Sequence, residues 1–362
     1  MLGCVGISTN GKLNHAGGDI MRKVNVGIAS FAHMHAFKYL EVFQELSWVN
    51  VTGFCDMLPE RRKSVQASHG IPSFASYGDL CHSNDVDIVL ITTETIDHLP
   101  VALAAFENGK DVIVEKPITT NLEDAKILIK SAEKYDCRVF QCYPCRYHPS
   151  VTRVKQLMHE GELGEITGFA STNHGKMPSS SDPATAWFSS KEKAGGGAIM
   201  DHTTHVADLI FHFTGWIPRS VFGVARRLFH DDINVDDAGM ILVKYNNGVA
   251  ASIDPSWNRP SSFPIWGDLT LCIYTTRQTV QLDLFNQNLR VYSTHGDESV
   301  QYSAYGPDID RFMLEDYLEC FIEGRSPPVT AIDGFNALKV AIKVYESSEK
   351  GDIVPWIPSE SF

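Results

Sequence analysis

The stretch Val112-Ile113-Val114-Glu115-Lys116-Pro117 begins with an apolar run and ends with a charged pair in front of a proline. The apolar run is the pattern of a buried β-strand, as found in parallel sheets. Proline fixes the backbone φ angle at the carboxyl end of this strand, and open α/β sheets bind their ligands at that edge. The stretch therefore predicts a parallel sheet with Lys116 in a ligand site rather than on the surface.

The residues around this stretch alternate between short apolar runs and helical patterns, which is typical of βαβ units. We expect strands over residues 24–29, 49–55, 88–92, 112–114 and 138–142, and helices over residues 35–44, 59–68, 99–107 and 122–134. The sequence therefore predicts an α/β fold that begins with a doubly wound, Rossmann-type dinucleotide-binding domain over residues 24–145.

The second half of the chain has a different pattern. We expect a linking helix over residues 151–160, strands over residues 166–171, 221–229, 239–245, 249–253, 269–274 and 280–284, and helices over residues 198–214, 310–323 and 334–350. Hairpin-type turns such as Asn246-Asn247-Gly248 separate several of these strands. Residues 146–362 therefore predict an α+β domain with a large, open, mostly antiparallel sheet.

Composition limits the class of partner. The 362 residues, 43% of them hydrophobic, suit two packed domains of roughly 100 to 200 residues each. The formal net charge is −13 and the basic residues form no cluster, so we expect neither a nucleic acid nor an anionic membrane as partner. The expected partner is a small molecule.

Neither a membrane anchor nor a metal site is predicted. No apolar run approaches the roughly 20 residues that span a bilayer, and residues 1–23 lack the basic start and apolar core of a signal peptide. We expect a cytoplasmic protein in which residues 1–23 form a flexible leader. Its eight cysteines are too sparse for a disulfide framework. Cys142 and Cys145 are spaced like half of a zinc site, but no second ligand pair accompanies them.

The turn after the first expected strand departs from the usual dinucleotide fingerprint. That fingerprint, G-x-G-x-x-G, places glycines where this chain has Ser30, Ala32 and His35. The N-terminus of the following helix still offers free N–H groups to a phosphate. We therefore expect a dinucleotide at this turn, in contact with Ser30, Phe31, Ala32 and His33.

An acidic residue at the end of the second strand indicates which dinucleotide binds. Asp56 lies where a carboxylate can bind ribose hydroxyls and repel a 2′-phosphate, so NAD is expected rather than NADP. Arg61 and Arg62 on the next helix are the counter-argument, and we interpret them as solvated surface groups. The remaining residues of the expected cofactor site are Thr92, His98, Glu115 and Lys116.

A second motif, Gly195-Gly196-Gly197-Ala198-Ile199-Met200-Asp201-His202-Thr203-Thr204-His205, carries the catalytic candidates. Asp201 and His205 are four residues apart, so on a helix they project from one face. Oxidation of an alcohol requires a base that takes the hydroxyl proton, and the sequence leaves this role open between Lys116 and His205. Asp201 is expected to orient the substrate. The three glycines are interpreted as a close backbone approach to a ligand, with a simple loop role as the alternative.

Further substrate-binding residues are predicted from position alone. Tyr143 and Arg146 follow the last strand of the first domain, His174 and Trp187 precede the glycine run, and His202 neighbours Asp201. Aromatic faces and bidentate donors suit a pyranose ring. Packing in the core is the alternative interpretation for the aromatic side chains.

Jointly, these motifs resemble one known family. Glu115-Lys116-Pro117 and residues 195–205, with Arg146-Tyr147-His148-Pro149 and residues 161–166 and 323–328, are similar to the glucose-fructose oxidoreductase, inositol dehydrogenase and rhizopine-catabolism family (Gfo/Idh/MocA). The resemblance covers residues 24–356. It implies NAD or NADP, hydride transfer at a sugar or polyol carbon, and a substrate domain over residues 146–362 that forms homo-oligomers through its open sheet. In the family's pattern Lys116 matches the catalytic lysine, Asp201 and His205 the D-x-x-x-H pair, and Asp56 the ribose-binding acid, whereas the missing glycines depart from it.

The predicted function is NAD-dependent oxidoreduction of a secondary hydroxyl group of a sugar, polyol or glycoside. Its sharpest form is oxidation at C3 of a glucoside. Three alternatives remain open at the level of sequence. The first is a glycosidase that reduces and reoxidises bound NAD within one turnover, and the second is a non-catalytic, nucleotide-sensing binding protein. The third is a metal-dependent isomerase built on Asp201, His202 and His205.

Overall fold

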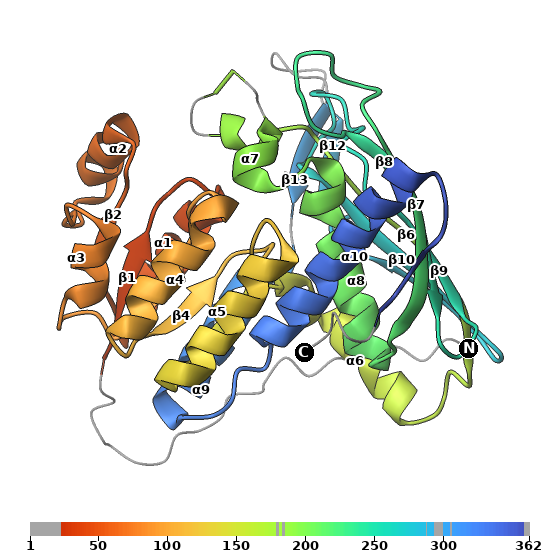
Figure 1. The fold of residues 1–362 in the computed structure, drawn as a ribbon, viewed down its shortest axis with the longest axis horizontal. Helices are drawn as coiled ribbons and strands as arrows, with labels where there is room; N and C mark the ends of the chain where they lie inside the picture. Colours follow the sequence, from red (N-terminus) through yellow and green to blue (C-terminus); the bar gives the residue numbers. More distant parts are fainter. Residues whose placement is uncertain are drawn as a thin grey trace.

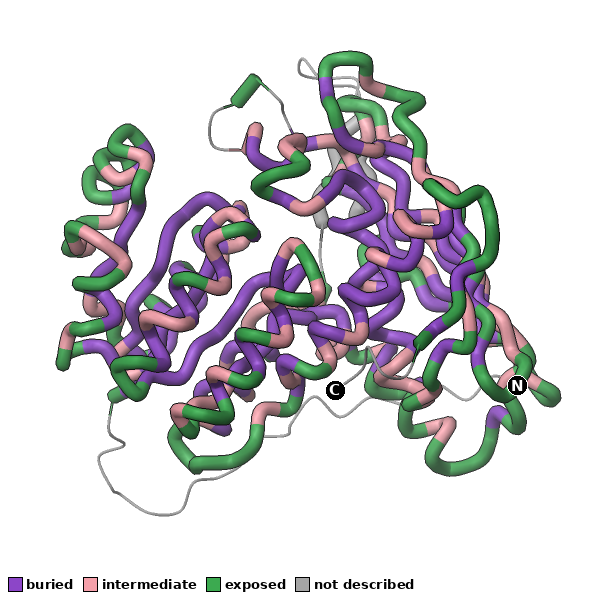
Figure 2. The backbone as a smooth tube through the Cα atoms, viewed as in Figure 1, coloured by how far each residue is buried: buried purple, intermediate pink, exposed green. Residues whose placement is uncertain are grey.

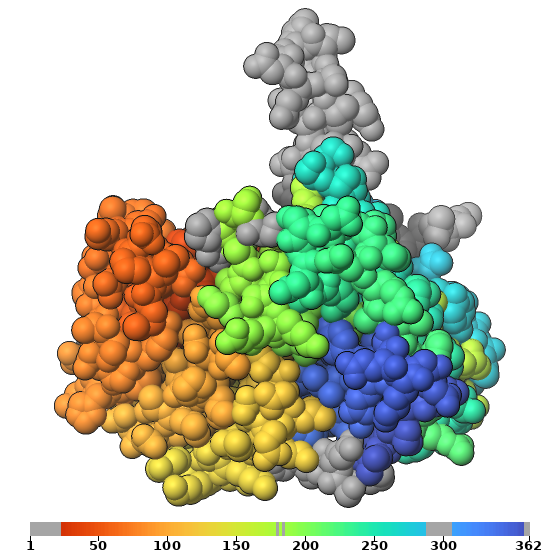
Figure 3. Space-filling view, turned by 45° about the horizontal axis from the view of Figure 1, so that its top comes forward, coloured from red at the N-terminus to blue at the C-terminus, as the bar shows by residue number. Residues whose placement is uncertain are grey.

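Two main β-sheets organise the molecule, one in each half of the chain (Figure 1). The computed structural model describes residues 23–178, 181–182, 185–286, 288–292, 300–304 and 306–357, with the backbone alone for residues 288–292 and 300–304. The expected leader, residues 1–23, lies outside the described residues apart from Lys23. The two halves of the chain lie against each other along a broad contact (Figure 3).

The N-terminal sheet is parallel throughout and has the strand order β2-β1-β3-β4-β5. Its strands are β1 (Val24–Ala29), β2 (Val49–Cys55), β3 (Ile88–Ile91), β4 (Asp111–Val114) and β5 (Val139–Gln141). Every residue of β3, β4 and β5 is buried, which explains why these strands are apolar apart from Asp111 and Gln141 at their ends (Figure 2). The strand order reverses between β1 and β3, and doubly wound folds bind their ligands at such a point.

Five α-helices accompany this sheet in the chain. They are α1 (His35–Glu45), α2 (Pro59–His69), α3 (Tyr77–His82), α4 (His98–Glu107) and α5 (Leu122–Tyr135). Asn121 caps α5 by accepting a hydrogen bond from the backbone N–H of Asp124. Short 3₁₀ turns η1 (Thr95–Asp97) and η2 (Pro144–Tyr147) follow β3 and β5.

The C-terminal sheet has seven strands in the order β11-β10-β6-β9-β8-β7-β14 and is antiparallel except where β6 pairs with β9. The strands are β6 (Ile166–Gly175), β7 (Pro218–Arg226), β8 (Ala238–Tyr245), β9 (Ala250–Asp254), β10 (Gly267–Thr275), β11 (Thr279–Asp283) and β14 (Val354–Pro355). A separate hairpin is formed by β12 (Asn288–Tyr292) and β13 (Val300–Ala304).

Helices cover one face of the C-terminal sheet (Figure 1). The helices of this half are α6 (Pro149–His159), α7 (Lys191–Ala194), α8 (Ala198–Thr214), α9 (Ile309–Glu323) and α10 (Ala331–Lys350), with the 3₁₀ turn η3 (Ala186–Ser189). α8 and α10 pack against each other, and α10 also packs on β7 and α5, while α9 packs on α1 and η2. α10 therefore bridges the N-terminal half and the C-terminal sheet, while α9 packs against the N-terminal half.

The predicted fold class is confirmed: a doubly wound parallel sheet precedes a largely antiparallel one. The differences lie at the edges of elements. β6 runs four residues beyond the expected end, β7 begins and ends three residues earlier, and α3, β14 and the β12–β13 hairpin were not predicted. Among the described residues, no helix is long and apolar enough to cross a membrane.

Candidate active site

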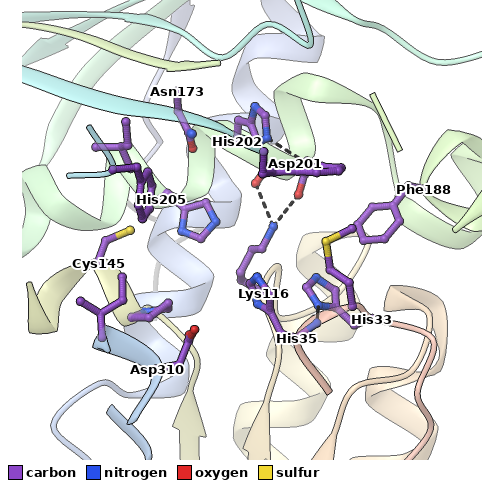
Figure 4. A pocket seen from close by; sticks show the side chains of 16 residues that line it. His33, His35, Lys116, Cys145, Asn173, Phe188, Asp201, His202, His205 and Asp310 are labelled. Atoms are coloured by element: carbon purple, nitrogen blue, oxygen red, sulfur yellow. Dashed lines mark hydrogen bonds and ion pairs between the residues drawn. The ribbon is translucent and has the colours of Figure 1, made fainter. Parts of the chain in front are cut away.

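The three catalytic candidates come together where the two halves of the chain meet (Figure 4). Lys116 lies directly after β4, and its peptide bond to Pro117 is cis. Asp201 and His205 lie on one face of α8, within its first two turns. The Lys116 ammonium forms an ion pair with the Asp201 carboxylate and lies 3.4 Å from the Asp201 carbonyl oxygen. All three side chains line the same cavity.

The Asp201 carboxylate is held by more than the lysine. Trp257 donates its indole N–H to Oδ2 at 3.2 Å, and His202 Nε2 lies 3.3 Å from the same oxygen. His202 Nδ1 in turn donates to the Pro255 carbonyl at 3.0 Å. Burial alone would raise the pKa of Asp201, but Lys116 and His202 hold this pKa below its usual range. Asp201 therefore stays ionised and fixes the position of the lysine.

His205 is the neutral member of the cluster. Burial lowers the pKa of His205 well below 6.5, and the positive charge of Lys116 lowers it further. Its Nδ1 is buried and has no hydrogen-bond partner among the described residues. The Tyr143 ring packs edge-on against the imidazole at a centroid distance of 6.1 Å. A neutral, unpaired imidazole beside an ammonium group is able to accept a proton from a bound hydroxyl.

The cavity around these residues has a volume of about 140 Å³. Asn173 on β6 lies on its wall with an unpartnered, buried Oδ1, and Phe188 in η3 and Asp310 in α9 also line it. Sequence reasoning missed these three residues. Asn173 falls inside a strand, and Phe188 and Asp310 lie in ordinary helical surroundings, so no local pattern distinguished them.

Glu115 does not line the cavity but forms hydrogen bonds with residues around it. The carboxylate is fully buried and accepts hydrogen bonds from the Tyr39 hydroxyl at 2.6 Å, from His35 Nδ1 at 2.9 Å and from the backbone N–H of Lys116 at 2.9 Å. Burial opposes ionisation, but His33 and His35 hold the pKa of Glu115 well below its usual value. In this structure Glu115 ties α1 to the loop that carries Lys116, and its predicted cofactor contact stays a prediction.

His33, His35 and Glu115 also form the one group of possible metal ligands that converges within 4.8 Å among the described residues. A cation there would lie at the N-terminus of α1, where the helix dipole is positive, and next to Lys116. His35 donates its ring proton to Glu115 instead. Asp201, His202 and His205 do not converge in this way, which argues against the metal-dependent isomerase.

The expected cofactor loop keeps its tight turn without glycine. Ser30 has a φ of +74°, and its hydroxyl donates to Asp56 Oδ2 at 3.0 Å and accepts from the Ala32 N–H at 3.1 Å. Thr92 donates its hydroxyl to the Ser30 carbonyl at 2.7 Å. Phe31 packs in the core between Phe37 and Phe54. Hydrogen bonds therefore replace the conformational freedom that glycine usually supplies here.

The predicted ribose contact of Asp56 is not available in this structure. The carboxylate is fully buried, and besides Ser30 it accepts from Phe31 N–H at 2.8 Å, Leu58 N–H at 2.9 Å and Arg61 Nε at 2.6 Å. Arg61, which we expected on the surface, is only 8% exposed. The sequence showed the two charges but not that they pair, because residues five apart across a strand–helix turn have no fixed spatial relation.

The residues at the end of the N-terminal sheet nevertheless fit a dinucleotide. The N-cap residue of α1, Met34, makes no side-chain hydrogen bond to the helix, although His33 Nδ1 accepts the His35 N–H at 3.3 Å, and the positive end of the helix dipole favours an anionic group nearby. The buried hydroxyl of Thr93, one residue beyond the predicted Thr92, has no partner among the described residues. The turn at Ser30 to His33, Thr93 and Lys116 are thus the groups that would hold the cofactor.

Five predicted residues lie elsewhere than expected. Arg146 is outside the cavity, because Asp208 and Asp333 bind its guanidinium in a buried ion-pair network. His98 is buried and bonds through Nδ1 to the Pro117 carbonyl at 3.0 Å, behind the lysine loop. Trp187 stacks on Phe188 and donates to the Ala32 carbonyl at 3.1 Å. Tyr143 lies behind His205, and His174 lines a neighbouring cavity.

The glycine run is explained by packing within the chain. A Cβ atom at Gly196 would lie 2.0 Å from the Tyr345 hydroxyl, and one at Gly197 would lie 1.8 Å from the Asp236 carbonyl oxygen. Gly195 has a φ of +84°. These contacts favour the simple loop role over a close approach to the ligand.

Comparison with known proteins agrees with this geometry. Residues 21–143 match the model of an oxidoreductase family with an NAD-binding Rossmann fold, and residues 151–281 match the GFO/IDH/MocA C-terminal domain. The chain belongs to the Gfo/Idh/MocA family. The resemblance inferred from the sequence is thereby confirmed, and so is the expectation of an NAD-binding oxidoreductase fold.

Several members of the Gfo/Idh/MocA family are similar to this chain. It is 25% identical over 306 residues to the scyllo-inositol 2-dehydrogenase (NAD(+)) of Bacillus subtilis, covering 82% of this chain and 85% of that protein. It is 26% identical over 207 residues to the levoglucosan dehydrogenase of Pseudarthrobacter phenanthrenivorans, where the match covers 51% of this chain and about half (53%) of the relative. The structure of GenD2 from gentamicin A biosynthesis, in complex with NAD, has the same fold, with a TM-score of 0.84 at 22% identity over 94% of this chain and 98% of GenD2.

Proposed function

We propose that this protein oxidises a secondary hydroxyl group of a sugar, polyol or glycoside and passes the hydride to NAD. In this proposal residues 24–145 bind the dinucleotide and residues 146–362 bind the substrate. One observation carries it: Lys116 from the end of β4 and Asp201 and His205 from α8 converge on one cavity. A non-catalytic binding protein would have no need of a paired lysine beside a neutral, unpaired histidine.

Each residue of the site has its own role in the proposed oxidation. NAD, when bound, supplies the hydride acceptor. His205 takes the hydroxyl proton, because its lowered pKa keeps it neutral and its Nδ1 is unpartnered. Lys116, held by Asp201, places its ammonium group beside the alkoxide that develops. Asn173 Oδ1, which has no partner among the described residues, orients a neighbouring hydroxyl, and His202 helps to hold the Asp201 carboxylate in place.

The reverse reaction uses the same groups. His205, once protonated, returns the proton to the oxygen of a ketone, and Lys116 polarises that carbonyl. Within the proposed class of substrates we favour a glucoside, oxidised at C3 as predicted from the sequence, and a further cavity that adjoins the polar one leaves room for its aglycone.

The test is formation of NADH from NAD, followed by absorbance, with a panel of sugars, polyols and glycosides. We expect one class of compound to support turnover, and Lys116→Met and His205→Gln each to lower kcat by about 10² to 10⁴ fold. Lys130→Met and His82→Gln, on exposed helix positions, are the matched controls and should leave the rate unchanged. Hydrolysis of a glycoside without net NADH would instead identify a redox glycosidase, and full activity in both site variants would refute the assignment.

We also propose that the protein forms homo-oligomers through the uncovered face of the C-terminal sheet. Phe222 on β7 is paired with Leu242 on β8, and both point away from α8 and α10, as do Met240 and Tyr274. Gly223, the neighbour of Phe222, faces Val344 of α10, which fixes this orientation. An apolar sheet face of this kind marks an interaction surface.

A further inference from the structure

We infer that the substrate carries an apolar aglycone about the size of an aromatic ring, and that this group binds in a second cavity beside the polar one. The inference rests on the proposed function and narrows its substrate to a hydrophobic glycoside. Three observations support it. The two cavities share part of their walls, Trp266 is exposed where they meet, and the polar atoms without a partner among the described residues line the first cavity.

The second cavity has a volume of about 370 Å³ and is continuous with the first. Met34, Asn173, Trp266 and Phe285 line both cavities, so a ligand with its sugar beside Lys116 extends directly into the second. Ile265 adds a further apolar wall. A free monosaccharide or a polyol would fill the first cavity and leave the second open.

Trp266 presents an apolar face at the junction of the two cavities. Its side chain is 42% exposed, which is unusual for so large an aromatic group. The backbone is fixed, since the Trp266 carbonyl accepts the Lys176 N–H at 2.9 Å just before β10 begins. A Cβ atom at Gly175 would lie 3.3 Å from Trp266 Nε1 and 2.6 Å from His202 Cε1, so the indole and the imidazole flank the same glycine. The exposed indole therefore adjoins the catalytic cluster.

Most polar side chains of the second cavity are already paired, and the exception is Asn173, which lies on the wall shared with the first cavity. Asp268 forms an ion pair with Arg259, and it accepts a hydrogen bond from Thr172 at 3.1 Å. His174 lies 3.1 Å from Asp254 through Nε2 and 3.2 Å from Arg259 through Nδ1. A hydroxyl-rich ligand would have to displace these partners, at the cost of leaving buried polar groups unpaired.

The first cavity has the opposite character. Asn173 Oδ1 and His205 Nδ1 are buried there without a partner among the described residues, and Lys116, Asp201 and His202 converge on the same space. The hydroxyl groups of a ligand can form hydrogen bonds in the first cavity. Its apolar part can pack in the second cavity against Trp266, Phe285, Ile265 and Met34. This division favours a sugar joined to an apolar group over a disaccharide.

Calorimetric binding to the full chain with NADH present tests the inference without requiring turnover. The probes are methyl β-D-glucoside, phenyl β-D-glucoside and cellobiose, followed by the matching sets with other sugars. We expect the phenyl glycoside of the preferred sugar to bind at least about ten-fold more tightly than the methyl glycoside, since it buries an additional ring. Trp266→Ala should remove the preference for the phenyl glycoside over the methyl glycoside, so that the two probes bind with equal affinity.

The control is Phe229→Ala, which removes an aromatic group that is also exposed (53%, against 42% for Trp266) and lines neither cavity. The affinities for the phenyl and methyl glycosides should be unchanged in Phe229→Ala. Equal binding of phenyl and methyl glycosides, tighter binding of cellobiose, or a phenyl preference that persists in Trp266→Ala would overturn the inference. Failure of every glycoside set to bind would overturn it as well, whereas the proposed function fails only if no sugar or polyol supports NADH formation.

Discussion

The partners and charges of single residues favour His205 over Lys116 as the proton acceptor. The sequence left the base open between Lys116 and His205, and the structure supplies a reason to prefer the histidine. Asp201 is ionised and paired with the Lys116 ammonium, whereas His205 has no partner at Nδ1 and is neutral. In the proposed mechanism Asp201 holds Lys116 in place, and His205 is the group that takes and returns the proton.

This assignment predicts the pH dependence of kcat/KM. The pKa of His205 lies well below 6.5, and the neutral form is active, so falling pH removes activity only below that value. We expect kcat/KM to stay level from pH 8 down to about 6.5 and to fall at more acid pH. His205→Gln should abolish this acid limb along with most of the rate, and His82→Gln should retain it. An acid limb centred above pH 6.5 would contradict the assignment.

At the scale of elements, the turn between β1 and α1 shows how serine can replace glycine. Ser30→Ala keeps the Cβ atom in the left-handed region and removes the hydroxyl that bonds to Asp56 and Ala32. Ser30→Gly removes the hydroxyl but also relieves the backbone, by about 1 kcal/mol. We therefore expect Ser30→Ala to cost about 1 to 3 kcal/mol of stability and Ser30→Gly to cost less.

The measurements for this pair are the midpoint of urea unfolding and the dissociation constant for NAD. We expect the wild type to have the highest urea midpoint and the tightest NAD binding, followed by Ser30→Gly and then by Ser30→Ala. A glycine variant less stable than the alanine variant would contradict this ranking, because both variants lack the hydroxyl and differ only in the Cβ atom at the left-handed φ angle.

The elements also show what the sequence could and could not predict. The buried run before Lys116 and the four-residue spacing of Asp201 and His205 are local signals, and both led to the correct strand and helix. Arg61, Arg146 and Trp266 were misjudged or missed, because their roles depend on partners distant in sequence or on a strand register. The β12–β13 hairpin lay beyond the last expected strand and was also missed.

At the scale of the whole molecule, the active site depends on how the two halves are joined. Lys116 comes from the parallel sheet and the other two catalytic candidates come from the helix against the second sheet, so neither half contains a complete site. α9 and α10 return to the N-terminal half, where α9 packs on α1 and α10 on α5. The opposite face of the C-terminal sheet takes no part in the contact between the two halves. That face is therefore available for a second copy of the chain.

The proposed assembly leads to a prediction about mass in solution. Leu242, 48% exposed at the centre of the uncovered face, would be buried between copies, and a carboxylate there would be desolvated without a partner. We expect light scattering after size-exclusion chromatography to give a multiple of 40.2 kDa for the wild type and a smaller species for Leu242→Glu. Leu228→Glu, in the loop after β7, is the matched control and should keep the wild-type mass. A wild-type monomer, or an unchanged mass for Leu242→Glu, would show that this face does not hold copies together, because an apolar contact of that size cannot tolerate an unpaired charge at its centre.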